Sequence, residues 1–269
     1  MIALALPAAT TGEGFVPPTT DELHLPDMIP WGAYYGEGFG KQMLLVLLSV
    51  VIIAVFFSRA SRKQALVPSK LQLVGEMGYG LVRDSIGKDI IGQRDFLKYV
   101  PLLFTVFFFV LVNNIYGAIP LIQLPSFSHP GSAYVLAGII YVLWITIGIR
   151  KHGLGYFKMV VVPSGVPWPL LIILIPIEII SNFLVRPVTH SLRLFATMMA
   201  GHLIILLAGS GIEYLLVLQD NIFLQAASLL VLVGGVAMYM LEALIMVIQA
   251  YVFTLLTAIY IQGALADEH

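Results

Sequence analysis

Residues 221–262 read NIFLQAASLLVLVGGVAMYMLEALIMVIQAYVFTLLTAIYIQ, and Glu242 is the one charged residue of this stretch. As a continuous α-helix the stretch would extend about 63 Å, because each residue adds 1.5 Å. The hydrocarbon core of a bilayer is only ~30 Å thick. The stretch therefore belongs in a membrane, but it is about twice too long for one upright span.

A second segment of the same kind precedes it. Residues 170–206 would form a helix of about 55 Å. Either each segment breaks into two spans, with Pro187 and Gly234-Gly235 as candidate break points, or each lies far from the membrane normal. Since no polar loop of ordinary length interrupts them, we predict two long, strongly tilted helices joined by a turn near 209–211. Typical spans tilt only about 20°, so we expect a partner with a curved or moving surface.

The composition of the whole chain supports a membrane protein. Of its 269 residues, 59% are hydrophobic and 11% are charged, whereas soluble domains carry about 25% charged residues. So few charges exclude a soluble globular enzyme, and a net charge of −1 excludes a nucleic-acid partner. The apolar stretches are continuous, which favours helices over an alternating transmembrane barrel.

We therefore predict an all-α integral membrane protein with about five membrane-embedded helices and an amphipathic interfacial helix. The predicted segments are an extracytoplasmic N-terminal segment (1–40), a first transmembrane helix (41–58), a cytoplasmic or interfacial amphipathic segment (59–98), a second and a third transmembrane helix (99–149) with an outside loop at 120–130, a cytoplasmic connector (150–169), and the tilted two-helix hairpin (170–269). A soluble loop with helical character is the alternative for residues 69–98.

The basic residues set the orientation. Residues 1–40 contain no Lys or Arg, whereas Arg59 directly follows the first span and Arg150-Lys151 directly follow the third. Cytoplasmic loops are the ones enriched in Lys and Arg. We predict that the N-terminus lies outside and the C-terminus in the cytoplasm.

Charged side chains inside apolar helices are the candidate functional residues. A central Arg or Asp costs at least ~2.5–3.5 kcal/mol on insertion scales, so a functional role is the default expectation. The two long segments contain Glu178, Arg186, His190, Arg193, His202 and Glu242, and the region between them adds Glu213 and Asp220.

Arg193 is the most informative of these residues. Because successive helical residues advance about 100°, Arg193 shares a side with Arg186 and Thr197. Arginine does not lose its proton, so Arg193 is a fixed cation that needs an anionic partner. A buried pair with Glu178 or Glu242, which would only lock two helices together, is the alternative. Arg186 stands nearer the cytoplasmic end, where we expect a snorkelling anchor.

His202 and Glu242 are candidates for proton transfer. His202 lies about 180° around the helix from Arg193, and Gln249 lies on nearly the same face as Glu242. Imidazole and carboxyl groups both change protonation near neutral pH in suitable surroundings, and such groups mark proton relays. A histidine satisfied within the core is the alternative for His202. The chain has no cysteine and no phosphate-binding, zinc-protease or dinucleotide motif, so we expect no cofactor and no metal.

Two stretches carry a family resemblance. Residues 186–202, RPVTHSLRLFATMMAGH, resemble the signature of subunit a of F-type ATP synthases, and residues 242–257 resemble the final helix of that family. Asn113-Asn114 and the Pro-Ser-Gly at 163–165 fit its second span and its connector. The resemblance covers nearly the whole chain from about residue 20.

This resemblance implies roles for individual residues. Arg193 matches the essential arginine of the family, and Gln249 matches the glutamine that faces it. His202 and Glu242 match a pair lining the half-channel that opens to the outside, and Glu178 resembles the acidic residue near the cytoplasmic exit. Secondary candidates are Asn113, Asn114, Glu213, Asp220, His190 and Arg186.

The sequence departs from the family pattern at two places. Many bacterial relatives have Glu first and His second in the pair, whereas His202 precedes Glu242 here, as in mitochondrial-like members. A reversal that keeps one acid and one imidazole indicates that the two side chains are neighbours. Thr197 stands where Asn is common, which puts in doubt any role that requires an amide there.

The resemblance implies a stator proton-channel subunit of a rotary ATP synthase, which is not catalytic by itself. Its partners would be the c-subunit ring, the b subunits of the peripheral stalk, the rest of the ATP synthase, the lipid bilayer and protons, in a bacterial plasma membrane. Protons are favoured over Na⁺ as the coupling ion. A secondary transporter with its own intramembrane charged site is the alternative, and a membrane scaffold would leave Arg193 and Glu242 without a role.

Overall fold

The computed structural model describes residues 15, 17–19, 40–61, 69–119, 126–127, 130–153, 155–162, 167–217 and 221–266. Within these ranges the regular structure is entirely helical, which confirms the all-α prediction. Five helices in the described ranges are long and apolar enough to cross a membrane. Some residues of the predicted segments lie outside the described ones: Arg62, Lys63, Asp220 and residues 163–165. The same holds for the predicted outside loop, of which only Ser126, Phe127 and Pro130 are described.

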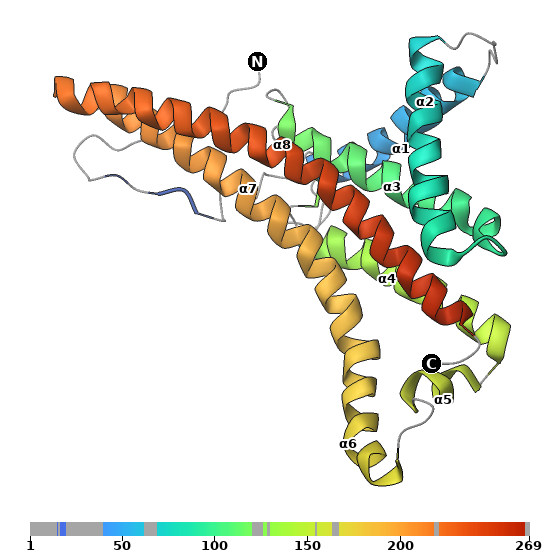
Figure 1. Ribbon diagram of the computed structural model, residues 1–269. Helices are drawn as coiled ribbons and strands as arrows, with labels where there is room; N and C mark the ends of the chain where they lie inside the picture. The colour runs from blue at the N-terminus through green and yellow to red at the C-terminus, as the bar shows by residue number, and fades with distance from the viewer. Residues whose placement is uncertain are drawn as a thin grey trace.

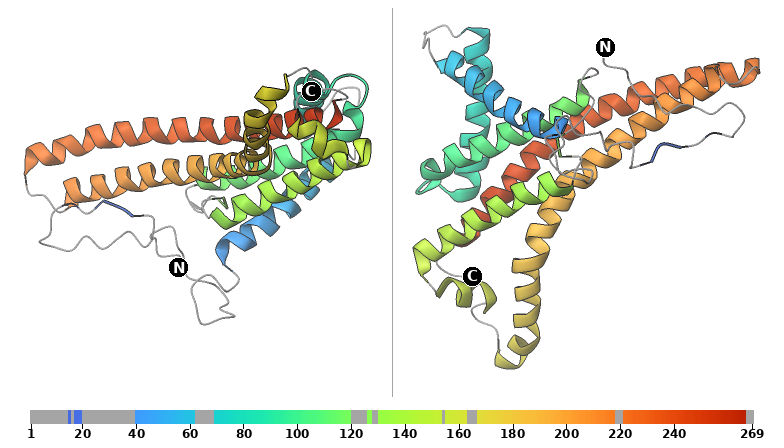
Figure 2. Two further views of the ribbon diagram at one scale, coloured as in Figure 1. Left: turned by 90° about the horizontal axis from the view of Figure 1, so that it is seen from below. Right: turned by 180° about the vertical axis from the view of Figure 1, so that it is seen from behind.

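Two very long helices dominate the architecture (Figure 1). α8 spans Ile222–Leu265 without interruption. Its partner continues from α6 (Trp168–Ile179) through the π-helical segment η3 (Ile180–Val185) into α7 (Arg186–Val217). α7 and α8 run antiparallel and side by side in every view (Figures 1 and 2). We call this pair the α7–α8 hairpin.

The length of α8 requires a steep tilt. Its 44 residues extend about 66 Å. To fit a ~30 Å core in a single crossing, the axis must lie more than about 60° from the membrane normal. The helix passes through Gly234-Gly235 without a break, so the prediction of a long continuous helix is confirmed.

The turn of the hairpin lies later than the sequence predicts. We expected it near 209–211, but α7 continues to Val217. Glycine in a membrane helix need not end it, because backbone groups have no water with which to form alternative hydrogen bonds. Gly211 lies beside α8, where a Cβ would make an ordinary van der Waals contact with Val231 Cγ1 at 3.7 Å, so this position accommodates the helix without strain.

The other long helix bends instead of breaking. Figure 1 shows that α6 and α7 form one helix with a change of direction between the labelled parts. η3 immediately precedes Pro187, the second residue of α7. Proline removes one backbone hydrogen bond, and π-helical turns are the other common cause of kinks. Pro187 is thus associated with a bend within a continuous helix.

The remaining helices pack against the C-terminal half of α8 and the start of α7. α1 (Lys41–Ser61), α3 (Phe96–Ala118) and α4 (Pro130–His152) end within three residues of the predicted spans. α3 lies on α8, α4 lies on α7 and α8, and α1 lies on α3. The shorter helices are α2 (Lys70–Gly80), the π-helical η2 (Leu81–Ile91) and α5 (Gly155–Val161).

Buried polar side chains link the helices within the apolar core. Asn113 on α3 donates to the Ser49 hydroxyl on α1 at 2.9 Å. Its neighbour Asn114 donates to the carbonyl of Met246 on α8 at 3.2 Å. Such bonds contribute to packing between membrane helices, where the apolar effect supplies no net attraction.

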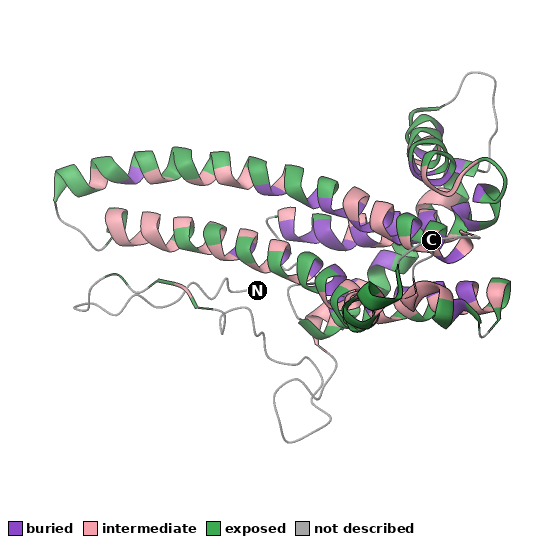
Figure 3. Ribbon diagram, turned by 60° about the horizontal axis from the view of Figure 1, so that its bottom comes forward, coloured by how far each residue is buried: buried purple, intermediate pink, exposed green. Residues whose placement is uncertain are grey.

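The end of the hairpin farthest from α3 and α4 projects beyond the other helices (Figure 3). Large apolar side chains are exposed there, with Phe223 at 81% and Leu230 at 79% of their full accessible area. Apolar exposure of this extent on long helices indicates a surface that faces lipid or another protein.

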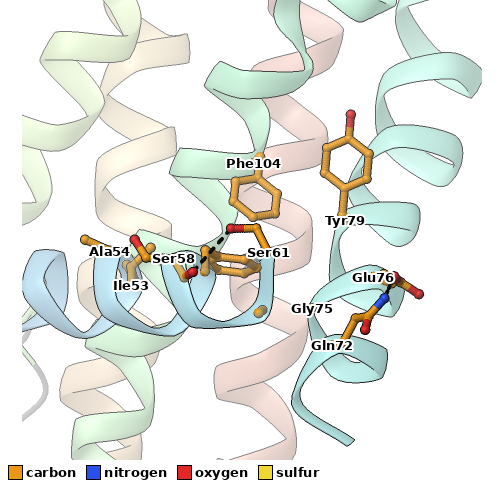
Figure 4. Close-up of a pocket in the computed structure, with 11 residues that line it drawn as sticks. Ile53, Ala54, Ser58, Ser61, Gln72, Gly75, Glu76, Tyr79 and Phe104 are labelled. Atoms are coloured by element: carbon orange, nitrogen blue, oxygen red, sulfur yellow. Dashed lines mark hydrogen bonds between the residues drawn. The ribbon is translucent and has the colours of Figure 1, made fainter. Parts of the chain in front are cut away.

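A cleft of about 600 Å³ opens between α1, α2 and α3 (Figure 4). Its polar wall carries Gln72, whose amide donates to the Glu76 carboxylate at 2.7 Å, and its apolar wall carries Phe104. None of the candidate residues from the sequence lines this cleft, so the candidate site must be sought on the hairpin.

Two glycines of α4 provide a test of the packing. A Cβ on Gly148 would lie 2.4–2.7 Å from the ring of Tyr156 on α5, whereas a Cβ on Gly138 would meet no atom within 4 Å. We expect Gly148→Ala to destabilise the protein by about 1–3 kcal/mol through overpacking. Gly138→Ala should be neutral or slightly stabilising, because alanine is the better helix former. Detergent-induced unfolding in mixed micelles measures both, and equal midpoints would contradict the observed α4–α5 contact.

Candidate functional site

The register between α7 and α8 determines which side chains meet. Three contacts fix it: the His190 ring stacks on Phe253 with centroids 3.9 Å apart, Gly201 lies against Glu242, and a Cβ on Gly235 would lie 3.1 Å from Ala208 Cβ. In each contact the two residue numbers add up to 443. The same antiparallel register places Arg193 opposite Ala250, at the level of Gln249.

Arg193 is exposed on the surface of the hairpin. Its side chain forms no ion pair and no hydrogen bond with any described residue; the ion pair within the described ranges joins Arg83 to Asp84 on η2. The described residues therefore do not form the alternative, an ion pair between Arg193 and a glutamate of the same chain. A permanent cation stands free on a membrane helix.

The surface beside Arg193 carries small apolar side chains. Ala196 and Ala200 follow it along α7 at helical spacing, and both are exposed. The hydroxyl of Thr197 donates to the backbone carbonyl of Arg193 at 2.8 Å, so it is satisfied within its own helix. Small side chains allow another helix to approach closely. This face, comprising Arg193, Ala196 and Ala200, is called the Arg193 face below.

His202 and Glu242 are both buried in the hairpin, at neighbouring levels of α7 and α8. His202 is 5% exposed and Glu242 is 6% exposed. A Cβ on Gly201 would lie 2.7–2.9 Å from the Cγ, Cδ and Oε1 atoms of Glu242, so the carboxyl group occupies the space beside the residue that precedes His202. Neither carboxyl oxygen nor His202 Nδ1 has a hydrogen-bond partner among the described residues. Buried groups of this kind normally bind water when no protein partner is present.

Two further polar residues lie along the same interface. Gln249 is 5% exposed, and its amide nitrogen has no partner in the described part of the chain. Asn114 bonds to the backbone of Met246, which stands between Glu242 and Gln249 on α8. The amide of Asn113 instead bonds to α1. The structure therefore brings Asn114, and not Asn113, to this part of the hairpin.

Glu178 and Arg186 share a separate cavity of about 270 Å³. Asn182 donates to Glu178 Oε2 at 2.7 Å. The Arg186 guanidinium lies over the rings of Trp144 and Tyr260, at 5.8 and 5.7 Å from their centroids. Arg186 is half-buried. Its guanidinium is stabilised by cation–π contacts with these two rings, in addition to the snorkelling expected from the sequence. We call this space the Glu178 cavity.

The remaining candidates are more distant. Glu213 is half-buried and lies about 16 Å beyond His202 along α7. Asp220 lies outside the described residues. His190 is 3% exposed and is packed between α7 and α8.

Sequence reasoning missed Gly201 and Tyr260 as parts of the site. Gly201 matters because its missing side chain makes room for Glu242, and only the register of two helices reveals this. Tyr260 lies against Arg186 on one side and the His190 ring on the other. Its aromatic ring gave no signal in a segment rich in apolar residues.

Comparison with known proteins places these residues in a family. Residues 43–262 match the family described as ATP synthase A chain. The chain belongs to this family. ATP synthase subunit a of Pseudarthrobacter chlorophenolicus is 73% identical over 270 residues, covering 100% of both chains. The subunit a of a Nocardioides species is 48% identical over 96% of both chains. That of Hyphomonas neptunium is 45% identical over 83% of this chain and 86% of its own.

The family match includes every described candidate residue, from Asn113 to Gln249. The resemblance expected from residues 186–202 and 242–257 is therefore confirmed at the level of the family.

The contact between Gly201 and Glu242 yields a prediction. Gly201→Ala should displace the Glu242 carboxyl group, because a Cβ would occupy its place. Since the displaced group is the end of a flexible side chain, we expect little loss of stability. ATP-driven proton pumping by membrane vesicles should fall at least about fivefold, because a small displacement of a reacting group lowers the rate strongly.

The matched control is Gly209→Ala, where a Cβ would meet no atom within 4 Å. This variant should pump like the wild type. Shortening the acid in Gly201→Ala/Glu242→Asp should restore part of the activity. Equal pumping by the Gly201 and Gly209 variants would show that the position of the carboxyl group does not matter.

Proposed function

We propose that this chain is the stator proton-channel subunit of a rotary ATP synthase. In this role it would provide two offset half-channels and a fixed arginine that couple proton movement to rotation of a c-subunit ring. It would make no ATP itself, because that reaction belongs to a catalytic head elsewhere in the complex. The single observation that carries the proposal is the exposed Arg193, which has no ion pair in the described chain.

An unpaired cation on a membrane helix needs a partner from outside the chain. Placing Arg in the hydrocarbon costs at least ~2.5–3.5 kcal/mol. A carboxylate on a neighbouring ring would offset that cost, and the small residues of the Arg193 face would allow the ring to approach. A nearby fixed cation favours the ionised form of such a carboxylate. Arg193 would thus make each arriving acid release its proton.

The steep tilt of the hairpin suits this partner. Helices that lie far from the membrane normal can follow the curved outer wall of a ring over much of their length. The exposed apolar side chains of the projecting end, such as Phe223 and Leu230, would face lipid or the ring. The family to which the chain belongs supports this assembly, since its relatives are named as subunits of ATP synthase.

Protons would arrive from the outside along His202 and Glu242. Both side chains are buried without hydrogen-bond partners in the described chain, so water and protons can bind them. Asn114 on α3 donates to the carbonyl of Met246, which lies one turn further along α8 toward Gln249 and the level of Arg193. We assign these residues to the half-channel that opens to the outside, with Glu213 and Asp220 as candidates nearer its mouth.

Protons would leave through the Glu178 cavity. Glu178 lies about 22 Å before Arg193 along the helix, and His202 lies about 14 Å after it. Arg193 therefore stands between the two polar groups along the same helix. Because its charge is fixed, it would repel a proton moving directly from one half-channel to the other.

A complete transfer would then require rotation. A ring carboxyl group protonated at the outer half-channel is neutral and can face lipid, and it reaches the inner half-channel after nearly a full turn. Each charge that crosses 100 mV releases about 2.3 kcal/mol, which rotation would deliver to the catalytic head. Protons are the coupling ion that His202 and Glu242 favour.

The proposed setting is a bacterial plasma membrane, with the N-terminus outside and the C-terminus in the cytoplasm. Basic residues at Arg59 and Arg150-Lys151 support this orientation. The b subunits of the peripheral stalk would hold the chain in place against the torque of the ring.

Arg193→Ala tests the proposal most simply. It should abolish ATP synthesis driven by a proton gradient, because no cation would remain to discharge the ring carboxyl group. Arg186→Ala should reduce the rate less, since Arg186 lies against two rings inside the bundle. Synthesis is measured in membrane vesicles with equal amounts of assembled complex. Normal rates in Arg193→Ala would refute the proposed coupling.

The His202–Glu242 pair offers a second test. The double exchange His202→Glu/Glu242→His keeps one acid and one imidazole beside Gly201, so it should retain more proton-driven synthesis than either single change. The difference should be at least roughly tenfold, because the double variant keeps both protonatable groups and a positioned proton-transfer group speeds such a step by about 10²–10⁴-fold. A double variant as inactive as both single variants would show that the two groups do not act together.

A further inference from the structure

His190 is the buried titratable residue for which the proposed function has no task. Its side chain is 3% exposed, and neither ring nitrogen has a hydrogen-bond partner among the described residues. An imidazole ring always carries at least one N–H donor, and its neutral form also carries an acceptor. Buried polar groups in native proteins bind protein partners or ordered water. We therefore expect the His190 ring to bind water.

His190 stands one helical turn beyond the Glu178 cavity on both helices that enclose it. On α7, Arg186 lines the cavity and His190 follows four residues later. On α8, Ala264 lines the cavity and Tyr260 precedes it by four residues. The Tyr260 ring contacts both sides, with centroid distances of 5.7 Å to the Arg186 guanidinium and 5.6 Å to the His190 ring.

His190 also stands one turn before the Arg193 face. Arg193 follows it by three residues on α7, and the two side chains are close enough to interact electrostatically. Arginine can only donate hydrogen bonds. The neutral His190 ring can also accept one. The hydroxyls of Thr189 and Ser191 lie on the same stretch of α7 but already donate to carbonyls of their own helix, whereas both nitrogens of His190 have no partner in the described chain. A side chain that can both donate and accept can join a chain of water molecules along which protons pass.

We propose that His190 binds water and extends the cytoplasmic half-channel from the Glu178 cavity to the Arg193 face. This inference rests on the proposed function, because it assumes that a proton leaves the ring near Arg193. It adds a residue whose chemistry is hydrogen bonding to water. Its ring is stacked on Phe253 and meets Tyr260 in an edge contact, so both neighbours hold the ring in place.

Thiol labelling tests this position without relying on activity. The chain has no cysteine, so His190→Cys introduces its single thiol. Charged, membrane-impermeant thiol reagents react with the thiolate, which forms where water reaches the sulfur. The assembled ATP synthase is labelled in inverted membrane vesicles, and the mass of this subunit reports the modification.

Two matched variants on the same helix calibrate the labelling. Asn182→Cys places the thiol in the Glu178 cavity, and Leu194→Cys places it in the apolar core, where Leu194 is 0% exposed. We expect the thiol at position 190 to react at least about tenfold faster than that at position 194, as thiolate access dictates. Reaction at 182 but not at 190 would overturn the inference and leave the proposed half-channel intact. No reaction at 182 would count against the half-channel itself.

A pair of conservative variants separates water binding from packing. His190→Phe keeps an aromatic ring on Phe253 but removes both nitrogens, and His190→Gln keeps a donor and an acceptor. In vesicles stripped of the catalytic head, passive proton flux should fall about tenfold in the Phe variant, as expected for one lost hydrogen-bonding step. The Gln variant should retain most of it. Wild-type flux in the Phe variant, or equal loss in both, would overturn the inference.

Discussion

A guanidinium group that cannot lose its charge stands on the apolar surface of α7, and the described chain supplies no counter-ion for it. In hydrocarbon such a charge is costly unless another molecule compensates it. The fold keeps Arg193 at the surface by burying the opposite side of α7 against α8 and α4. In the proposed function the hairpin would present this cation to a partner, and the length of α8 would set the steep tilt at which it does so.

The buried polar residues are arranged around this charge in two separate groups. His202 and Glu242 occupy the hairpin on one side, where Gly201 provides space for the carboxyl group. Glu178 and Asn182 line a cavity on the other side. Along α7, Arg193 stands between the two groups. This arrangement would suit the two proposed half-channels, because a continuous polar path would let protons cross without turning a rotor.

Much of this structure could be predicted from the sequence, and the failures have physical reasons. The long helices and the isolated Glu242 were predictable because hydropathy and charge are properties of single segments. The turn lies later than the glycines at 209 and 211 predict, since backbone groups inside lipid keep their helical hydrogen bonds even at glycine. Periodicity describes one face of one helix, so it could not give the register that joins Gly201 to Glu242. The aromatic setting of Arg186, between Trp144 and Tyr260, depends on three helices at once.

In the proposed function Arg193 acts on an acid carried by another subunit. A density map of the chain assembled with its ring shows whether it does. We expect a ring carboxyl group within about 6 Å of the Arg193 guanidinium, close enough for the cation to favour its ionised form. An Arg193 side chain that faces only lipid or solvent, with every ring carboxyl group passing beyond that range, would contradict the proposed function.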